Sequence, residues 1–480
     1  MSDLQQQQVD NATQLKSFDK SGYLAEDTIA AISSAVGGAI AVVRLSGPLA
    51  FAILKDLSQK AVTFEPRKAF RLQIQPTSTQ WIDDALCLCF VGPSSFTGED
   101  VVEFHVHGGA FTASRLMEIL LEKGARQALP GEFSFRAVRN GKLTLSQASA
   151  ISDLITAQNP EAAHLALEKM SGTQNKLISD LTKNLRTLCV LGEIGIDFSD
   201  QDVDEVSLEN LRKRLVPLLK ILETLHSSYH RGIRIQNGIS VAFVGLPNAG
   251  KSSFFNALLG EDRSIVSDIP GTTRDVIREH LTLRGKNHTL TFRLEDTAGL
   301  RSTENPIEKI GIERTEKSAK TADLILLLID ATHSVDEAFE AWNKLNLPSQ
   351  KTLGVITKTD LVPELDQGTF LRSLESFKIK NWVFTSSVTG LGISNMIDLM
   401  TDYSNPWVER SQGEVLLTRL DQVQAIENAI EHLKRAQKAS EIDLFASDIR
   451  QSLHALDPLI GETTPDDILG QIFSEFCIGK

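Results

Sequence analysis

The residues best suited to chemistry lie in Gly245–Ser252, where glycines, a lysine and a serine have the spacing of a phosphate-binding loop. A short apolar run at 239–244 predicts a buried strand before the loop, and residues 253–259 continue as a helix. Backbone N–H groups of such a loop and the helix N-terminus bind phosphate oxygens. Lys251 would reach the β and γ phosphates, and the Ser252 hydroxyl would hold Mg²⁺. The stretch predicts a nucleoside triphosphate site.

Two later segments supply the groups that a triphosphate with Mg²⁺ needs. Thr273, within residues 271–275, is placed to give Mg²⁺ a second hydroxyl and to sense the γ phosphate. Asp296 follows a strand predicted at 289–294, and its carboxylate would hold the water shell of the metal. The Gly299 N–H would meet the γ phosphate. Together these segments predict that the site recognises a triphosphate.

Two more segments predict that the base is guanine. Thr357–Asp360 ends a strand predicted at 353–356, and the Asp360 carboxylate can accept hydrogen bonds from guanine N1 and its exocyclic amine. Adenine cannot supply that pair of donors. Ser386–Val388 ends a strand predicted at 382–384, and its backbone can bind the guanine oxygen. Ligands of doubly wound sheets bind at the carboxyl ends of strands, so we expect these segments to converge on GTP.

Two positions depart from the usual GTPase pattern. Thr357 stands where asparagine is most frequent, which bears mainly on affinity. Leu300 stands where Ras-type enzymes carry the glutamine that orients the attacking water, and leucine cannot do so. A polar group must therefore come from elsewhere, and Glu304 and Glu308 lie just downstream. An exposed helix start explains both glutamates equally well on pattern alone.

The whole chain has 480 residues and a net charge of −13, which indicates several domains and argues against a protein coated by nucleic acid. Residues 1–22 are polar and glutamine-rich, so we expect a disordered tail rather than a signal peptide. Apolar runs are too short to span a bilayer, and the four cysteines lack zinc spacing. We expect a cytoplasmic protein with no membrane partner.

Hydrophobic periodicity divides the rest of the chain into four parts. Residues 23–142 alternate short strands with turns and predict an α+β domain. Residues 143–237 and 409–480 have helical periodicity, with one long helix expected at 208–236 and kinked at Pro217. Between them, residues 238–408 alternate strand and helix, as in a doubly wound parallel sheet. The sequence therefore predicts a multidomain α/β protein with a Ras-like P-loop domain inserted into a helical domain.

Charged residues inside predicted strands mark a second candidate site in the N-terminal part. Arg44 and Glu103 fall in strands predicted at 39–45 and 101–106; a further strand is expected at 85–91 and a helix at 113–123. A buried charge needs a partner, which makes both residues site candidates. Exposure on a solvated sheet face fits the pattern equally well.

With these residues considered, the chain resembles the MnmE (TrmE) family of tRNA-modification GTPases from Asp27 to Lys480. The glycine loop continues in the family pattern to Ser253. Further signatures are matched by Phe96–Val101, Pro130–Phe133, Asn140–Leu143 and the C-terminal Phe476–Lys480. The last of these, Phe-Cys-Ile-Gly-Lys, is a hallmark of the family.

The resemblance implies an N-terminal domain that dimerises and binds 5-formyl-tetrahydrofolate or a related one-carbon folate. By matched position, the folate contacts would be Arg44, Glu103, Lys142 and Lys480. Relatives usually have a Pro-Pro-Gly-Arg loop where this chain has residues 32–38, so the rim of that pocket differs. Cys477 could act as a nucleophile, or it could simply pack.

The resemblance also implies K⁺-dependent dimerisation of the GTPase domains, with the cation acting as an arginine finger does elsewhere. Glu308 matches the catalytic glutamate, which acts through a bridging water and is thereby favoured over Glu304. The implied K⁺ ligands are Asn248, Ser267, Ile269 and Thr272. The full set of expected GTP-binding positions is Asn248, Ala249, Gly250, Lys251, Ser252, Ser253, Ser267, Asp268, Ile269, Pro270, Gly271, Thr272, Thr273, Asp296, Thr297, Ala298, Gly299, Thr357, Lys358, Asp360, Ser386, Ser387 and Val388.

Members of the family work with a flavoprotein, MnmG (GidA), in a heterotetramer-type complex on tRNA. Together they attach an aminomethyl-type group, such as carboxymethylaminomethyl, to carbon 5 of the wobble uridine. An RNA-binding ribosome-assembly GTPase is the alternative, but it would carry a basic RNA-binding domain. A membrane-remodelling GTPase would need a lipid-binding stretch. We find neither feature in the sequence, and the candidate folate residues and the C-terminal motif favour tRNA modification.

Overall fold

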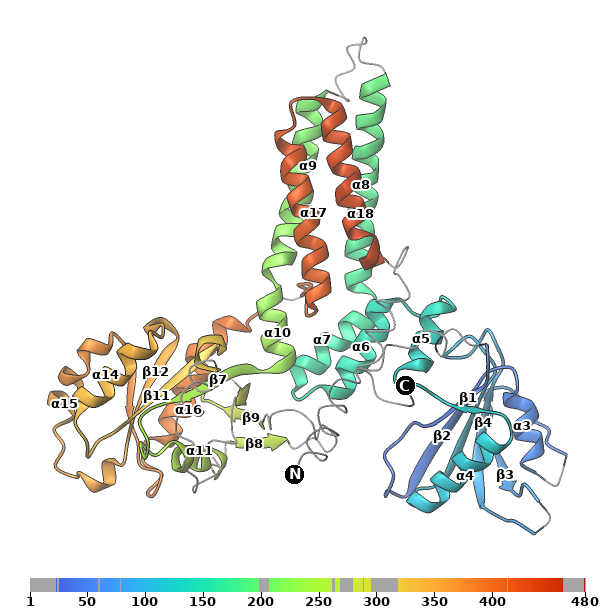
Figure 1. Ribbon diagram of the computed structural model, residues 1–480, viewed down its shortest axis with the longest axis horizontal. Coiled ribbons are helices and arrows are strands. Elements are labelled where there is room, and N and C mark those ends of the chain that lie inside the picture. Colours follow the sequence, from blue (N-terminus) through green and yellow to red (C-terminus); the bar gives the residue numbers. More distant parts are fainter. Residues whose placement is uncertain are drawn as a thin grey trace, which may run out of the picture. The chain divides into compact units, whose positions relative to one another are not determined.

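A computed structural model describes residues 23, 26–58, 61–77, 79–197, 207–260, 264–267, 279–287, 289–294, 318–411, 413–460 and 479 (Figure 1). The chain forms two compact units. One comprises residues 1–152, 168–212 and 431–480, and the other comprises 153–167 and 213–430. Within the described ranges, no helix has both the length and the apolar character needed to cross a membrane.

The first unit contains a six-stranded sheet in the order β3-β4-β5-β2-β1-β6. Alternating side chains of its strands pack on α3 (Ala50–Asp56) and α4 (Ala110–Glu122), because residues two apart share one face of a strand. The strands are β1 (Ile29–Ile32), β2 (Ile40–Ser46), β3 (Phe70–Ile74), β4 (Asp83–Phe90), β5 (Val101–His107) and β6 (Arg126–Gln127). Antiparallel pairing of β2 with β5 places Arg44 directly opposite Glu103.

The strands predicted at 39–45, 85–91 and 101–106 and the helix at 113–123 correspond to β2, β4, β5 and α4, each within a few residues. The prediction missed β1, β3, β6 and the helices α3 and α5 (Glu132–Arg139). β6 has two residues, which is too short for a periodic pattern. Helix α5 has only eight residues, fewer than a reliable periodic pattern needs, and it is buried around charged residues, Glu132 and Arg136, which the sequence alone would place at the surface.

A second, seven-stranded sheet lies in the other unit, in the order β13-β12-β11-β7-β10-β9-β8. Helices α11 (Lys251–Gly260) and α16 (Ile393–Ser404) pack on one face, and α14 (Val335–Leu345) packs on the other (Figure 1). α15 (Gln367–Ser373) lies between β12 and β13 in the chain. The strands are β7 (Ile239–Val244), β8 (Ser264–Ser267), β9 (Glu279–Arg284), β10 (Thr289–Leu294), β11 (Leu324–Asp330), β12 (Thr352–Thr357) and β13 (Trp382–Phe384).

The seven-stranded sheet is mixed rather than wholly parallel as predicted. β13, β12, β11, β7 and β10 run parallel, whereas β9 is antiparallel to both β10 and β8. Residues 285–288 join β9 to β10, and so short a connection can link only antiparallel neighbours. The doubly wound fold class is confirmed, with an antiparallel edge added to its parallel core.

Helices make up most of the remaining described chain. They are α6 (Leu145–Thr156), α7 (Pro160–Met170), α8 (Thr173–Asp197), α9 (Leu208–Ser227), α10 (Tyr229–Asn237), α17 (Leu420–Lys438) and α18 (Ile442–Ile460). The single helix predicted at 208–236 was wrong in one respect. α9 continues through Pro217 and ends at Ser227, and α10 begins after Ser228. The buried Ser228 hydroxyl donates to the Leu225 carbonyl and accepts a hydrogen bond from the Leu417 amide, which stabilises the break.

Candidate nucleotide and folate sites

The glycine loop connects β7 to α11, as its sequence predicts. A Cβ atom on Gly245 would lie 2.5 Å from the Leu328 carbonyl oxygen, so only glycine lets the loop start this close to β11. Asn248 and Gly250 have left-handed backbones, with φ of 62° and 82°. These two positions turn the chain into the N-terminus of α11, where backbone N–H groups bind anions.

Lys251 folds back over this loop. Its Nζ donates to the carbonyl oxygens of Gly245 and Leu246, both at 2.8 Å, and burial lowers the pKa of the ammonium group. Among the residues described in the structure, no carboxylate forms an ion pair with Lys251. A partly buried cation held only by neutral carbonyls gains most when phosphate oxygens replace them, because hydrogen bonds between ionised groups are the stronger kind.

Thr357, the residue that departs from the common asparagine, joins three segments of the site. Its hydroxyl lies 2.8 Å from the Ala249 carbonyl oxygen of the loop and 3.2 Å from the Ile329 carbonyl oxygen of β11. The side chain is buried. A hydroxyl at this position therefore ties the end of β12 to the phosphate loop, which gives a physical reason for threonine here.

The remaining guanine-side residues lie at the same edge of the sheet. Asp360 lies in a short 3-10 turn after β12, and the Thr359 hydroxyl donates to the Thr385 carbonyl beyond β13 at 3.0 Å. Ser386 is buried, and its backbone N–H donates to the Leu391 carbonyl at 2.9 Å. Val388, by contrast, is 85% exposed, so the turn after Ser386 opens to solvent at the edge where a base would bind.

Asp330 is a residue of this site that the sequence analysis missed. It ends β11, and its carboxylate forms an ion pair with Lys358 Nζ at 2.6 Å. Burial alone would raise the pKa of Asp330, but Lys358 and the two donors of Thr332 outweigh it and hold the pKa below its usual value. The apolar run 324–329 before Asp330 is the signal that could have identified it, since it predicts another strand ending at this edge.

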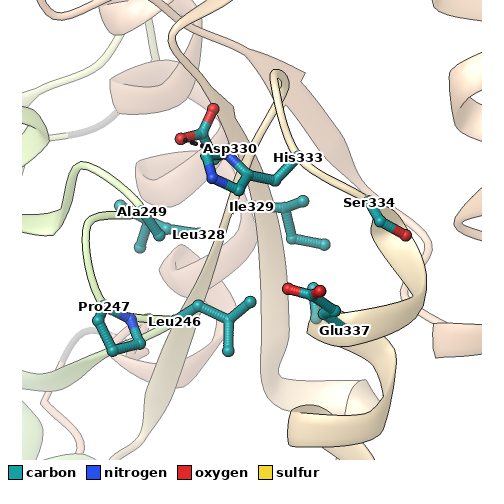
Figure 2. A pocket seen from close by; sticks show the side chains of 10 residues that line it. Leu246, Pro247, Ala249, Leu328, Ile329, Asp330, His333, Ser334 and Glu337 are labelled. Carbon is teal, nitrogen blue, oxygen red and sulfur yellow. Dashed lines mark ion pairs between the residues drawn. The ribbon is translucent and has the colours of Figure 1, made fainter.

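A cavity of about 260 Å³ lies behind the phosphate loop (Figure 2). Leu246, Pro247 and Ala249 of the loop form one wall, and the end of β11 and the start of α14 form the others. Asp330 and His333 lie together at one end of it (Figure 2). In the strand order, β11 lies between β7, which leads into the phosphate loop, and β12, which leads into Thr357–Asp360, so Asp330 lies between the two segments that would hold phosphates and base.

Several predicted site residues lie outside the described part of the chain. They are Asp268, Ile269, Pro270, Gly271, Thr272, Thr273, Asp296, Thr297, Ala298, Gly299, Leu300, Glu304, Glu308, Cys477 and Lys480, and for Ser267 only its place at the end of β8 is described. Their roles stay predictions.

On the N-terminal sheet, Arg44 and Glu103 form the predicted pair. Arg44 Nε donates to Glu103 Oε1 at 2.9 Å, and the two side chains are 23% and 17% exposed. The guanidinium also lies over the rings of Phe96 and Phe133, at 5.8 and 5.6 Å from their centroids. Of the two interpretations left open by the sequence, the structure favours a partnered, half-buried pair over isolated solvated charges.

A buried charge network holds the loops around this pair. Arg136 is fully buried and contacts the carboxylates of Asp27, Glu99 and Glu132, which come from three segments of the chain. Arg126 contacts two of the same carboxylates: its Nε lies 2.7 Å from Asp27 Oδ2, and its Nη2 lies 2.7 Å from Glu132 Oε1. The sequence analysis missed this network, although Glu99 and Glu132 lie in two of the matched signatures, Phe96–Val101 and Pro130–Phe133. Charged residues in a short helix such as α5 do not reveal from sequence alone which distant carboxylates will pair with them.

The other two expected folate residues are placed only in part. Lys142 is exposed, and its side chain lies beside Gly98 of the Phe96–Val101 signature. Lys480 is not described, but Gly479 lies against the end of β1, where an added Cβ would be 2.6 Å from the Ile32 carbonyl oxygen. Gly479, the residue of the C-terminal motif that the structure describes, therefore lies against the N-terminal sheet.

The glycine loop, its lysine and the Thr-Lys-Thr-Asp segment at the carboxyl edge of a doubly wound sheet define a P-loop protein of the GTPase class. Comparison with known families agrees. Residues 28–142 match the model of the GTP-binding protein TrmE N-terminus, and residues 145–477 match that of the MnmE helical domain.

Curated relatives match over nearly their full length. Proteins called tRNA modification GTPase MnmE are 38% identical in Neisseria meningitidis serogroup B (94% of this chain, 99% of the relative) and 37% identical in Synechocystis (95% and 99%). The relative from Protochlamydia amoebophila is 36% identical (95% and 98%). The chain belongs to the MnmE family of tRNA modification GTPases. The G domain of T. maritima FeoB aligns with 35% of the chain and 98% of its own length, at 27% identity and a TM-score of 0.25, which carries no weight for the fold.

Proposed function

We propose that this chain hydrolyses GTP in the cytoplasm while it acts, as a homodimer and with the flavoprotein MnmG, on the wobble uridine of certain tRNAs. The product would carry an aminomethyl-type group, such as carboxymethylaminomethyl, at carbon 5. The proposal rests on the presence in one chain of a phosphate loop, whose lysine donates to two carbonyl oxygens, and of the Arg44–Glu103 pair. The family named for tRNA modification supplies the substrate class.

The GTP chemistry follows from the loop. Lys251 would exchange its two carbonyl partners for β and γ phosphate oxygens, and Asp360 would accept the two guanine donors. The Ser252 hydroxyl, at the first turn of α11, and Thr273 would hold Mg²⁺. The hydroxyl and phosphate oxygens of this donor set suit a hard cation. Mg²⁺ supplies charge neutralisation when bound.

A one-carbon folate would bind on the N-terminal sheet. Arg44, Lys142 and Lys480 offer cations to its glutamate tail, and Glu103 offers a carboxylate to the donor edge of the pterin. Because Arg44 already pairs with Glu103, a ligand would have to insert between partners that Phe96 and Phe133 keep half-buried.

Hydrolysis would need two groups beyond the phosphate loop. Asn248, Ser267, Ile269 and Thr272 would bind K⁺ as two GTPase domains dimerise, and Glu308 would position the attacking water. Na⁺ is too small to contact the same oxygens at once. GTP turnover should therefore be faster in KCl than in NaCl at matched ionic strength, and equal rates would exclude the K⁺ site.

Reconstitution with purified components tests the proposed function. The chain, its flavoprotein partner, GTP, a one-carbon folate, an amine donor such as glycine and unmodified tRNA would be combined, and the wobble nucleoside would be analysed by mass spectrometry. We expect a modified uridine only in the complete mixture. Full modification without this chain or without GTP would contradict the proposal.

Affinity for tRNA should come mainly from the partner, because a chain of net charge −13 binds a polyanion weakly. Basic residues on helices α8, α9 and α10 would add a small contribution, within 176–186 and 212–234. Binding by the complex should exceed binding by the chain alone and should weaken steeply with salt. Tight, salt-insensitive binding by the isolated chain would contradict this view.

A further inference from the structure

We propose that Asp330 is a positioning residue for guanine nucleotide binding, acting through Lys358. Asp330 ends β11, the strand between the one that leads into the phosphate loop and the one that leads into Thr357–Asp360. Its side chain is 7% exposed, which removes the carboxylate from the surface where a nucleotide would bind. Any effect of Asp330 on the nucleotide must therefore pass through the residues that it holds.

The Asp330 carboxylate is fixed from several sides. Oδ1 accepts hydrogen bonds from the Thr332 backbone N–H at 2.9 Å and from the Thr332 hydroxyl at 2.7 Å. Oδ2 faces Lys358 Nζ at 2.6 Å and His333 Nδ1 at 3.2 Å. Figure 2 shows Asp330 and His333 side by side at one end of the cavity. With one oxygen held by Thr332, the other is aimed at Lys358 and cannot rotate away without losing two hydrogen bonds.

Lys358 needs such an anchor because its backbone is in the left-handed region, with φ of 57°. A residue with a Cβ atom is disfavoured there by roughly 1–2 kcal/mol, and it stays only where its surroundings enforce the conformation. Lys358 lies between Thr357, which is bonded to the phosphate loop, and Thr359, which is bonded to the β13 loop. The ion pair therefore fixes the one residue in this segment whose backbone is strained.

The consequence concerns the base rather than the phosphates. Since Asp330 occupies the Lys358 ammonium, the aliphatic stem is the part of this side chain left to form a wall for the purine ring. The same anchor sets the position of Asp360, two residues on, whose carboxylate would accept the guanine donors. Loss of the anchor should weaken binding of GTP and GDP alike and should leave the hydrolysis step unchanged.

The test compares Asp330→Asn and Asp330→Ala with wild type in the full-length protein. Affinity for a fluorescent GDP analogue, and KM and kcat for GTP, would be measured for each variant, with thermal unfolding of the nucleotide-free protein recorded alongside. We expect about a tenfold higher Kd and KM with kcat within twofold, the effect of losing one charge-assisted contact. Asp330→Asn keeps the shape and the acceptor for Thr332, so it reports on the charge even if Asp330→Ala folds poorly.

Two further variants separate positioning from general damage. Glu337→Gln removes an exposed acid that lines the same cavity, and it should leave Kd unchanged. In a Lys358→Ala background, Asp330→Asn should have no further effect on Kd, because its influence passes through Lys358. Unchanged Kd in Asp330→Asn, a fall in kcat at constant KM, or losses that add fully in the double variant would each overturn the proposal.

Discussion

Lys251 at the phosphate loop donates to two neutral carbonyls, whereas Arg44 of the N-terminal sheet and Arg136 of the neighbouring helix α5 are paired with carboxylates. The Lys251 ammonium can therefore form ion pairs with phosphate oxygens without breaking an existing ion pair among the described residues. Arg44 and Arg136 already form ion pairs that stabilise the N-terminal fold, so a ligand that binds Arg44 must compete with Glu103. The comparison implies that the first site is built for tight phosphate binding and the second for a ligand that brings both acceptors and donors.

The same contrast holds for the backbone. The nucleotide site lies at the carboxyl ends of parallel strands and uses loop residues such as Gly250 in left-handed conformations. The N-terminal site lies on the face of a largely antiparallel sheet, where the register of β2 and β5 sets Arg44 against Glu103. Substitutions should therefore affect binding at the first site and stability at the second.

The largest expected effect follows Arg136→Leu in the buried network. Removing the guanidinium leaves Glu132, which is fully buried, and Glu99 without this partner, and such a change costs about 3–5 kcal/mol of unfolding free energy. Urea unfolding monitored by hydrogen exchange in β1 and β2 measures it. Arg139→Ala is the matched control, because its contact with Glu99 is 4.0 Å long and partly exposed, and it should cost less than about 1 kcal/mol. Equal costs would show that the network does not stabilise the sheet.

Lys251→Ala should have the next largest effect, and on activity rather than stability. Loss of a charged donor to the phosphates is expected to lower GTP turnover roughly 10²–10³-fold. The melting temperature of the nucleotide-free protein should hardly change, since within the described part of the chain Lys251 loses two hydrogen bonds to neutral carbonyls. Steady-state hydrolysis and calorimetry measure the two quantities. A large loss of stability with normal GTP turnover would show that Lys251 stabilises the fold and does not bind the phosphates, which would contradict the comparison.

Glu308→Ala would sharpen the comparison by separating binding from hydrolysis within the nucleotide site. As a residue that positions water, Glu308 should account for about 10²-fold in turnover, with GDP and GTP affinity near wild type. Glu304→Ala is the matched control and should have little effect. If affinity falls while turnover per bound GTP is unchanged, Glu308 has a structural role, and Glu304 becomes the candidate for catalysis.

Acid pH should have a smaller effect, on the stability of the N-terminal sheet. Burial raises the pKa of Asp27, but Arg126 and Arg136 outweigh it and bring the pKa below its usual 3.8. A carboxyl with a lowered folded pKa contributes stability above its unfolded pKa and loses it as pH falls through the folded value. The N-terminal sheet should therefore lose stability below about pH 4. Hydrogen exchange in β1 measures the loss, and Asp27→Asn should reduce the pH dependence; an unchanged dependence would exclude Asp27 as its source.

Much of the nucleotide site could be predicted because its motifs describe backbone geometry. The sequence of Gly245–Ser252 identifies a strand, a turn and a helix at once, and the structure confirms all three. Asp330 was missed because one acid after an apolar run has no motif, and its importance depends on Lys358, 28 positions later. Arg136 was missed for a similar reason: its partners are Asp27 and Glu99, which only the folded sheet brings together.

The central claim is that the two sites serve one tRNA modification. The most direct measurement is nucleoside mass spectrometry of tRNA from cells that lack this gene and carry wild type, Lys251→Ala or Arg44→Ala, with GTP hydrolysis of each purified protein measured in parallel. We predict that both variants lose the modified wobble uridine, and that only Lys251→Ala loses GTP hydrolysis. Wild-type levels of the modified nucleoside with either variant would contradict the claim.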